Sequence, residues 1–243
     1  MVLYAGIVSS ERIAGRTGFG AVMGSKRLKA ITSNGSRKLE MDDEQAFKEY
    51  TKWVREMFLG HPVLGEKLRR FGTAGIVSTT NPRNILPTRN FKYGHHPDAL
   101  NVSGEYMEDH ELTGVKSSCI HCPVSCGRDV EIKGVGRVKG PEYETVALLG
   151  PNLEILDLKQ VAEWNYLADD MGMDTISRGT VLGFAMELQE RGLLQAGIRF
   201  GDATGISDLI TDIAHRRGLG HDLADGVKRM SERYGGHDFA MHV

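Results

Sequence analysis

The sequence predicts an α+β protein in which a short β segment comes first and a mostly helical domain follows. Three observations support this fold class. The run Val2–Val8 is apolar and of strand type, apolar residues recur at helical spacing from Met41 onward, and alternating residues around Gly134 indicate a hairpin. With 243 residues and 40% hydrophobic content, the chain can bury a core as one large domain or two smaller ones.

The N-terminal segment joins its strand to a glycine-rich loop. Four glycines lie between Gly15 and Gly24, and the cationic side chains of Arg12, Arg16 and Lys26 flank them. Backbone amides in such a loop can approach an anion closely, because glycine has no Cβ. Glycine loops are also common in turns that bind nothing, so the pattern alone leaves anion binding open.

A polar run after the glycine loop divides the chain into two predicted domains, 1–38 and 39–243. Apolar spacing, aspartate caps and glycine stops predict the elements on either side. These are a second short strand at 28–31, helices at 42–59, 63–71, 157–171, 174–188, 207–216 and 221–234, and a hairpin over 130–139. In the first of these helices, Phe47, Tyr50, Val54 and Phe58 are spaced for one buried face.

Composition excludes two classes of partner. The formal net charge of -2 leaves no basic excess to neutralise phosphates, so we expect no nucleic acid. No apolar run has membrane-spanning length, so we expect no membrane. The first residues lack the basic start and long apolar middle of a signal peptide, and we expect a cytoplasmic protein with reduced cysteines.

The three cysteines stand together as Cys119-Ile-His-Cys122-Pro-Val-Ser-Cys126. Thiolates at this spacing can turn inward from one loop to hold a metal, and the proline after Cys122 favours the bends that this requires. A four-iron cluster usually takes four cysteines, whereas zinc also accepts histidine, such as His121. Spacing alone therefore indicates metal and leaves iron–sulfur cluster and zinc undecided.

Two groups of carboxylates are candidates for acid–base or binding chemistry. Glu142 and Glu144 would share a face if their segment is extended. Asp169, Asp170 and Asp174 lie at a tight corner between two predicted helices, where they can line a polar pocket. A solvated strand and ordinary helix capping would explain the same residues.

Three separate segments resemble the aldehyde:ferredoxin oxidoreductase family, whose members carry tungsten or molybdenum on a paired pterin cofactor beside a four-iron cluster. Residues 14–26 are similar to its first-domain glycine segment, the cysteine run 119–126 to its cluster motif, and residues 169–174 to its D-x-x-G-L-D pterin motif. Stretches 85–90 and 140–145 resemble further parts of the family.

The resemblance implies a site with two cofactors. A [4Fe-4S] cluster would take Cys119, Cys122 and Cys126 as ligands. Tungstopterin or molybdopterin, as a bis-pterin, would lie beside it. The residues expected to bind the pterin are Arg12, Ile13 and Gly15 at its phosphates and Asp169, Met173 and Asp174 at its rings. Met173 stands where the family usually has leucine, an exchange that keeps an apolar side chain.

The resemblance also implies that the chain is a fragment. Residues 1–38 would be the C-terminal part of the pterin-covering β domain, a remnant of an N-terminal sheet. Residues 39–243 would be the mostly α-helical domain with the iron–sulfur cluster loop. A fourth cluster ligand and a second pterin motif are expected in a third domain outside this sequence.

The activity that the resemblance implies is oxidation of a small aldehyde to a carboxylic acid, with ferredoxin as electron acceptor. Glu144 would move the proton, with Glu142 behind it. The resemblance is compatible with a homo-oligomer but does not define the oligomeric state. Two alternatives are a related subunit that reduces an aromatic thioester ring within a larger complex, and a zinc-stabilised helical binding module completed by His110 or His121.

Overall fold

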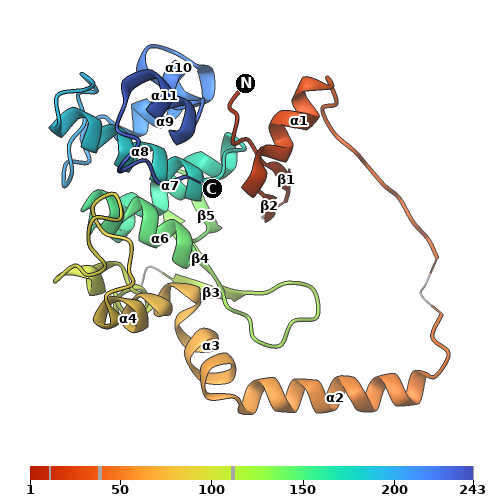
Figure 1. Cartoon of the computed structure of the whole chain (residues 1–243). Helices are drawn as coiled ribbons and strands as arrows, with labels where there is room; N and C mark the ends of the chain where they lie inside the picture. The colour runs from red at the N-terminus through yellow and green to blue at the C-terminus, as the bar shows by residue number, and fades with distance from the viewer. Residues whose placement is uncertain (11, 38–39, 111–112, 243) are drawn as a thin grey trace.

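A computed structural model describes residues 1–10, 12–37, 40–110 and 113–242 (Figure 1). Helices dominate these residues, and two small antiparallel sheets complete an α+β fold, which confirms the predicted class. The domain boundary predicted between residues 38 and 39 falls outside the described part of the chain. Among the described helices, none combines the length and the apolar character needed to cross a bilayer.

The elements have the following bounds. The α-helices are α1 Phe19–Ser25, α2 Glu44–Gly60, α3 Arg69–Phe71, α4 Val77–Thr80, α5 Gly104–Asp109, α6 Tyr143–Leu149, α7 Leu158–Asp170, α8 Thr175–Glu190, α9 Ile206–His215, α10 Leu219–Leu223 and α11 Val227–Tyr234. The strands are β1 Ile7–Ser9, β2 Arg12–Ala14, β3 Thr113–Ser117, β4 Gly127–Ile132 and β5 Gly136–Lys139. A π-helical turn, Pro62–Leu68, leads into α3.

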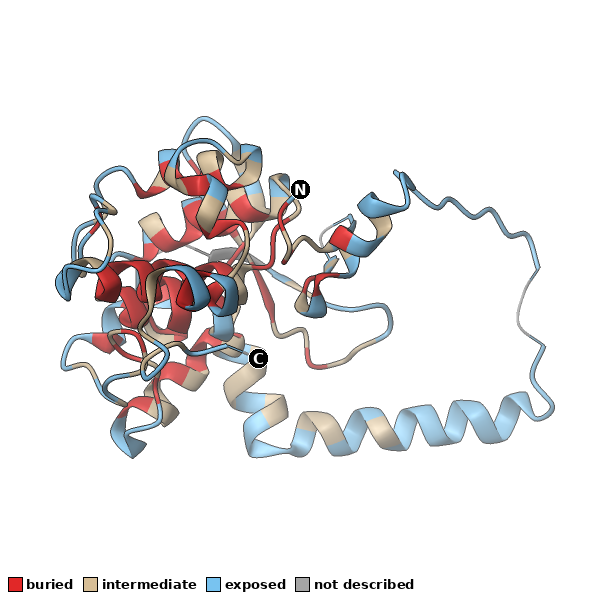
Figure 2. Ribbon diagram, turned by 45° about the horizontal axis from the view of Figure 1, so that its top comes forward, coloured by how far each residue is buried: buried red, intermediate tan, exposed pale blue. Residues whose placement is uncertain are grey.

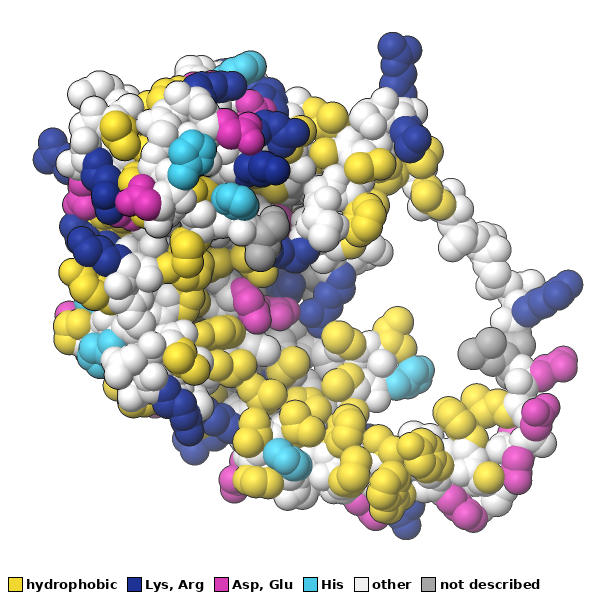
Figure 3. All heavy atoms as spheres, viewed as in Figure 1, with side chains coloured by type: hydrophobic (Ala, Val, Ile, Leu, Met, Phe, Trp, Pro, Cys, Tyr) yellow, Lys and Arg dark blue, Asp and Glu magenta, His cyan; other side chains and the backbone are white. Residues whose placement is uncertain are grey.

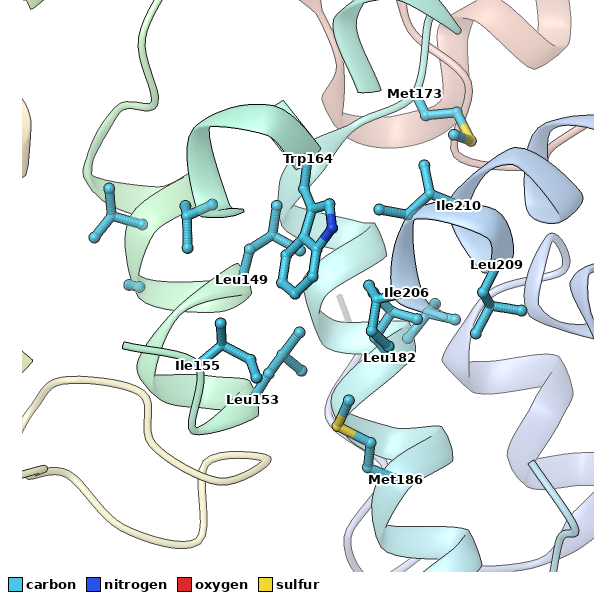
Figure 4. Packing of buried hydrophobic residues seen from close by; sticks show 14 of the residues in the cluster. Leu149, Leu153, Ile155, Trp164, Met173, Leu182, Met186, Ile206, Leu209 and Ile210 are labelled. Carbon is cyan, nitrogen blue, oxygen red and sulfur yellow. The ribbon is translucent and has the colours of Figure 1, made fainter. Parts of the chain in front are cut away.

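The core is a helical body built around α8. Trp164 of α7 is fully buried, and it lies beside Leu149 of α6 with Leu182 and Ile206 on its other side (Figure 4). Helices α6 and α8 approach closely at Gly179, where an added Cβ would lie 2.6 Å from the carbonyl oxygen of Leu148. Buried apolar side chains of α6, α7, α8 and α9 thus belong to one core cluster, to which shorter helices and β4 also contribute.

Aspartate caps begin the two central helices as predicted. Asp157 accepts hydrogen bonds from the amides of Lys159 and Gln160 at the start of α7, and Asp174 caps α8. The hairpin predicted over 130–139 is also confirmed as β4 and β5. The helix predicted over 221–234 is instead two helices, because Gly226 has a φ of 83° and interrupts it.

The first residues form backbone hydrogen bonds with residues at the ends of helices, and only a short part of this segment is a strand. Leu3 donates its amide to the carbonyl of Ala224, and Gly6 donates to Gly172, each at 2.9 Å. The strand predicted over 2–8 therefore begins only at Ile7, because the amides of Leu3 and Gly6 already have partners outside any sheet. The strand predicted at 28–31 is wrong: these residues form an exposed connection with no neighbouring strand in the described chain.

Helix α2 is present as predicted, but the burial predicted for its apolar face is wrong. Of the predicted face, Phe47 and Tyr50 are 51% and 62% exposed and Val54 and Phe58 are only half-buried, and α2 has no buried residue. The helix projects away from the body (Figure 2), and hydrophobic side chains gather along it (Figure 3). Periodicity predicts an apolar face but not what covers it.

Candidate active site and cysteine loop

A hollow of about 440 Å³ lies where β2 and β5 meet the end of α7. Cationic side chains reach it from two elements, Arg12 from β2 and Lys139 from β5, and Ile13 adds apolar surface beside them. Asp169 and Asp170 at the end of α7 also line it. The hollow thus brings β2, which directly precedes the glycine segment, together with the aspartate corner, although Arg12 and Asp169 are 157 residues apart in the sequence.

Glu142 links the two cations at the edge of this hollow. Its Oε1 lies 3.2 Å from Nη1 of Arg12 and 3.3 Å from Nζ of Lys139. Glu144 follows in the first turn of α6, where its side chain is exposed and has no ion pair or hydrogen bond with any described residue. The extended geometry considered for this pair is wrong, because the segment is helical from Tyr143 and residues two apart on a helix face different directions.

Asp169 reaches the hollow from the last turn of α7. Burial raises the pKa of its carboxyl, and the nearby charges of Lys139 and Arg178 partly oppose that shift. Asn165, one turn earlier on the same helix, donates a hydrogen bond from Nδ2 to Oδ2 of Asp169 at 3.4 Å. Asp169 is therefore a half-buried acceptor that faces space wide enough for a ligand.

Asp174 and Met173 form the corner after α7 and face away from open solvent. Asp174 is 4% exposed, and its Oδ2 accepts hydrogen bonds from the amide of Ser177 at 2.8 Å and from the Ser177 hydroxyl at 2.5 Å. The side chain of Met173 is buried in the core. Gly15 lies against this corner, since an added Cβ would be 3.0 Å from Oδ1 of Asp174.

Arg178 is a residue that the sequence analysis missed. Its guanidinium is fully buried and donates from Nη2 to the carbonyl of Trp164 at 2.8 Å, while Nε and Nη1 have no partner among the described residues. Burial lowers its pKa to about 10, and the charges of Tyr4, Asp169 and Asp174 oppose the shift. A lone arginine within the apolar run of α8 was the signal that could have identified it.

The cysteines lie on the loop between β3 and β4, which extends from the body (Figure 1). Cys122 donates its amide to the carbonyl of Cys119 at 3.0 Å, and His121 and Ser125 adopt left-handed backbone conformations that turn the loop. Cys119 is exposed and the other two are half-buried. No group of three or more metal-binding side chains converges among the described residues, so the thiols are not gathered.

The loop and the hollow are electrostatically connected. Burial raises the pKa of the Cys126 thiol, and the carboxylate of Glu142 adds to that shift. The charge of Glu142 thus acts on Cys126, while its carboxylate is paired with the cations Arg12 and Lys139. His110 stacks on Tyr106 at a ring distance of 3.7 Å, and His121 is exposed, so neither completes a metal site in the described structure.

The residues present fit an anionic cofactor and a thiolate-held metal. Cations line the hollow, Gly15 leaves no side chain between β2 and the corner, and Arg178 keeps two nitrogen atoms, Nε and Nη1, unpaired among the described residues. Three thiols at the spacing of a cluster loop supply the donor chemistry of iron–sulfur centres. Together these features define a chain of the kind that holds a metal centre beside an anionic cofactor.

Comparison with known families agrees with this class. Residues 1–35 match the aldehyde ferredoxin oxidoreductase N-terminal domain, and residues 49–243 match domains 2 and 3 of aldehyde ferredoxin oxidoreductase. The chain belongs to the aldehyde ferredoxin oxidoreductase family.

Individual relatives give the same result. The chain is 41% identical over 252 residues to a tungsten-containing aldehyde ferredoxin oxidoreductase of Pyrococcus abyssi and 40% identical to one of Thermococcus kodakarensis, each match covering 100% of this chain. It spans 41% of the length of these relatives. An aliphatic sulfonate oxidoreductase, WOR-like subunit, of Pyrococcus furiosus is 34% identical over 89% of the chain and 36% of that protein.

A solved structure shares the fold. The active-site complex BamBC of benzoyl coenzyme A reductase superposes with a TM-score of 0.73 over 98% of this chain and 38% of that one. Its sequence identity is 22%, so this likeness supports the fold alone.

Proposed function

We propose that this chain forms the cofactor-binding portion of a tungsten- or molybdenum-pterin, iron–sulfur oxidoreductase that oxidises aldehydes to carboxylic acids and passes the electrons to ferredoxin. The observation that carries the proposal is the cationic hollow, in which Arg12 and Lys139 both pair with Glu142, in a chain that also presents three thiols on one loop. The tungsten-containing relatives support the cofactor, and the free cysteines support a reducing cytoplasm. In this proposal residues 1–38 and 39–243 belong to two domains of the whole enzyme.

Binding roles follow from the donors and acceptors of each residue. Arg12, with the backbone of Ile13 and Gly15, would hold the pterin phosphates, because guanidinium and amide groups donate to phosphate oxygens. Asp169 and Asp174 would accept from the pterin ring, while Met173 fixes the corner between them. Cys119, Cys122 and Cys126 would ligate the cluster. When bound, the metal pterin supplies two-electron redox chemistry and the cluster relays single electrons.

Glu144 is the proposed proton acceptor of the site. Its exposed carboxylate is free of ion pairs with the described residues, whereas the Oε1 of Glu142 is held between Arg12 and Lys139. A carboxylate held in ion pairs orients the side chains around it, whereas a carboxylate without ion pairs can accept a proton from a substrate oxygen. Glu142 therefore acts behind Glu144 as an orienting group.

Substitution of Glu144 tests this assignment. Glu144→Gln should lower kcat about 100-fold or more while metal and pterin contents stay unchanged. Glu163→Gln is the matched control, because Glu163 is an exposed carboxylate on α7 that bonds only to Gln160 in the described structure. Equal activities of the two variants would exclude Glu144 as the proton acceptor.

Metal analysis of the anaerobically prepared intact protein tests the proposal as a whole. We expect iron together with tungsten or molybdenum, and ferredoxin-linked oxidation of small aldehydes. Zinc without these metals would support the helical binding module and exclude the enzyme. Turnover of an aromatic thioester without turnover of aldehydes would support the ring-reducing alternative, which shares its fold with this chain.

A further inference from the structure

Two arginines, neither of them in a predicted cofactor motif, donate hydrogen bonds to backbone carbonyls of the cysteine loop. Arg128 donates from Nη1 to the carbonyls of Ser125 at 3.0 Å and Gly127 at 2.6 Å. These carbonyls belong to the residues on either side of Cys126. The guanidinium of Arg128 therefore fixes the backbone of that cysteine directly.

The second arginine extends this contact to the next cysteine. Arg69 donates from Nη1 to the carbonyl of Pro123, the residue after Cys122, at 2.6 Å. Arg128 in turn donates from Nη2 to the backbone carbonyl of Arg69 at 2.7 Å, so the two side chains form one network, here termed the arginine clamp. Gly72 lets this segment approach the loop, because an added Cβ would lie 2.9 Å from the carbonyl of Cys126.

Among the described residues no carboxylate forms an ion pair with the clamp; the charge of Glu108 acts on Arg128 only at longer range, and Glu108 is already paired with Arg70. Arg128 is 7% exposed, and all its hydrogen-bond partners in the described structure are neutral carbonyls. A buried cation without a counter-ion is costly, so its presence indicates an anion nearby. Deprotonated Cys122 and Cys126 on an iron–sulfur cluster would supply that negative charge at the backbone positions that the clamp holds.

The geometry points to the arginine clamp as a pair of positioning residues that preset the cysteine loop and raise the reduction potential of its cluster. This inference rests on the proposed function. Oxidation of an aldehyde with water yields a carboxylic acid, two protons and two electrons, and the cluster passes these electrons one at a time to ferredoxin. Each electron makes the cluster one unit more negative, so a fixed cation beside it stabilises the reduced form more than the oxidised form.

The test is an anaerobic redox titration of the intact protein, with the cluster followed by electron paramagnetic resonance. Arg128→Gln should shift the reduction equilibrium at least tenfold toward the oxidised form, which is about 59 mV for a one-electron couple. Arg128→Lys keeps the charge and should stay within threefold of the unsubstituted protein. Arg233→Gln is the matched control, since the Arg233 guanidinium is partly exposed and pairs with Asp222, away from the clamp; the reduction potential of this variant should be unchanged.

Arg69→Gln keeps the inference testable if Arg128→Gln does not retain iron. Because Arg69 is only half-buried, its loss should shift the equilibrium in the same direction by about threefold. An unchanged potential in an iron-loaded Arg128→Gln or Arg69→Gln protein would overturn the inference and leave the proposed function standing. An unsubstituted protein that contains no iron would overturn both.

Discussion

Replacing Asp174 by alanine or by asparagine separates its part in folding from its proposed part in cofactor binding. Alanine removes the cap on the amide and hydroxyl of Ser177 and the ion pair with Arg16 at 3.9 Å. Loss of the cap costs about 1 kcal/mol, within a range of about 0.5–2, and the partly exposed ion pair adds at most about 1 kcal/mol. Asp174→Ala should therefore lower the free energy of unfolding by about 2 kcal/mol.

Asparagine caps helices as well as aspartate does, so Asp174→Asn should cost less than about 1 kcal/mol. For a chain of this size, 1 kcal/mol corresponds to about 2–4 °C in Tm, and thermal unfolding followed by circular dichroism resolves such a difference. Both variants lose the carboxylate charge, which contributes about 1.5–3 kcal/mol to a hydrogen bond, so pterin binding should weaken at least about tenfold in each.

Asp157→Ala is the control, because Asp157 caps α7 in the same way at the opposite end of that helix from the hollow. It should lower the free energy of unfolding by about 1 kcal/mol and leave the pterin content unchanged. Equal losses of Tm in Asp174→Asn and Asp174→Ala would refute the capping argument. Full pterin retention by Asp174→Asn would refute the cofactor role.

The remaining predictions concern packing, pH and metal. Gly179→Val should lower the free energy of unfolding, measured by denaturant titration, by about 1–3 kcal/mol because α6 leaves no room for a side chain. Gly35→Val is the control: no atom lies near its added Cβ, so its free energy of unfolding should change by less than about 0.5 kcal/mol. Burial raises the pKa of the Asp169 carboxyl, so the folded chain binds a proton at this carboxyl more tightly than the unfolded chain does. This proton binding stabilises the fold below about pH 4, and the stabilisation is lost as the pH rises through the pKa of the folded state. Asp169→Asn should consequently raise Tm at neutral pH and leave it unchanged below about pH 4, and equal gains at both pH values would contradict the burial argument. Cys122→Ser should abolish the cluster signal of the intact protein, while the neighbouring exposed change Ser118→Ala should preserve both signal and iron content.

Local signals in the sequence were enough to predict the helical body. Asp157 and Asp174 stand directly before apolar residues at helical spacing, and glycines follow where the helices end. Capping, periodicity and glycine stops act within a few residues, so they can be read without knowledge of the fold. The hairpin of β4 and β5 was predictable for the same reason.

Features that depend on distant partners were not predictable in this way. Residues 28–31 have strand-forming side chains, but no described strand lies beside them. Glu142 and Glu144 were expected on one extended face, yet Glu142 precedes a helix and its partner Arg12 lies 130 residues away. Nothing in the local sequence of Arg128 shows that its partners are loop carbonyls. Such roles depend on which segments meet after folding.

The exposed position of α2 has a consequence for hydrogen exchange. A helix of 17 residues is marginal in water by itself, since nucleation is costly and most helical stability in proteins comes from tertiary packing. The Asp43 cap and the Lys48–Glu44 and Lys52–Glu56 pairs each add about a kcal/mol or less. Amide protons of α2 should therefore exchange through local opening, almost as fast as those of a free peptide. Amide protons of the buried α8 should exchange only through global unfolding of the helical body.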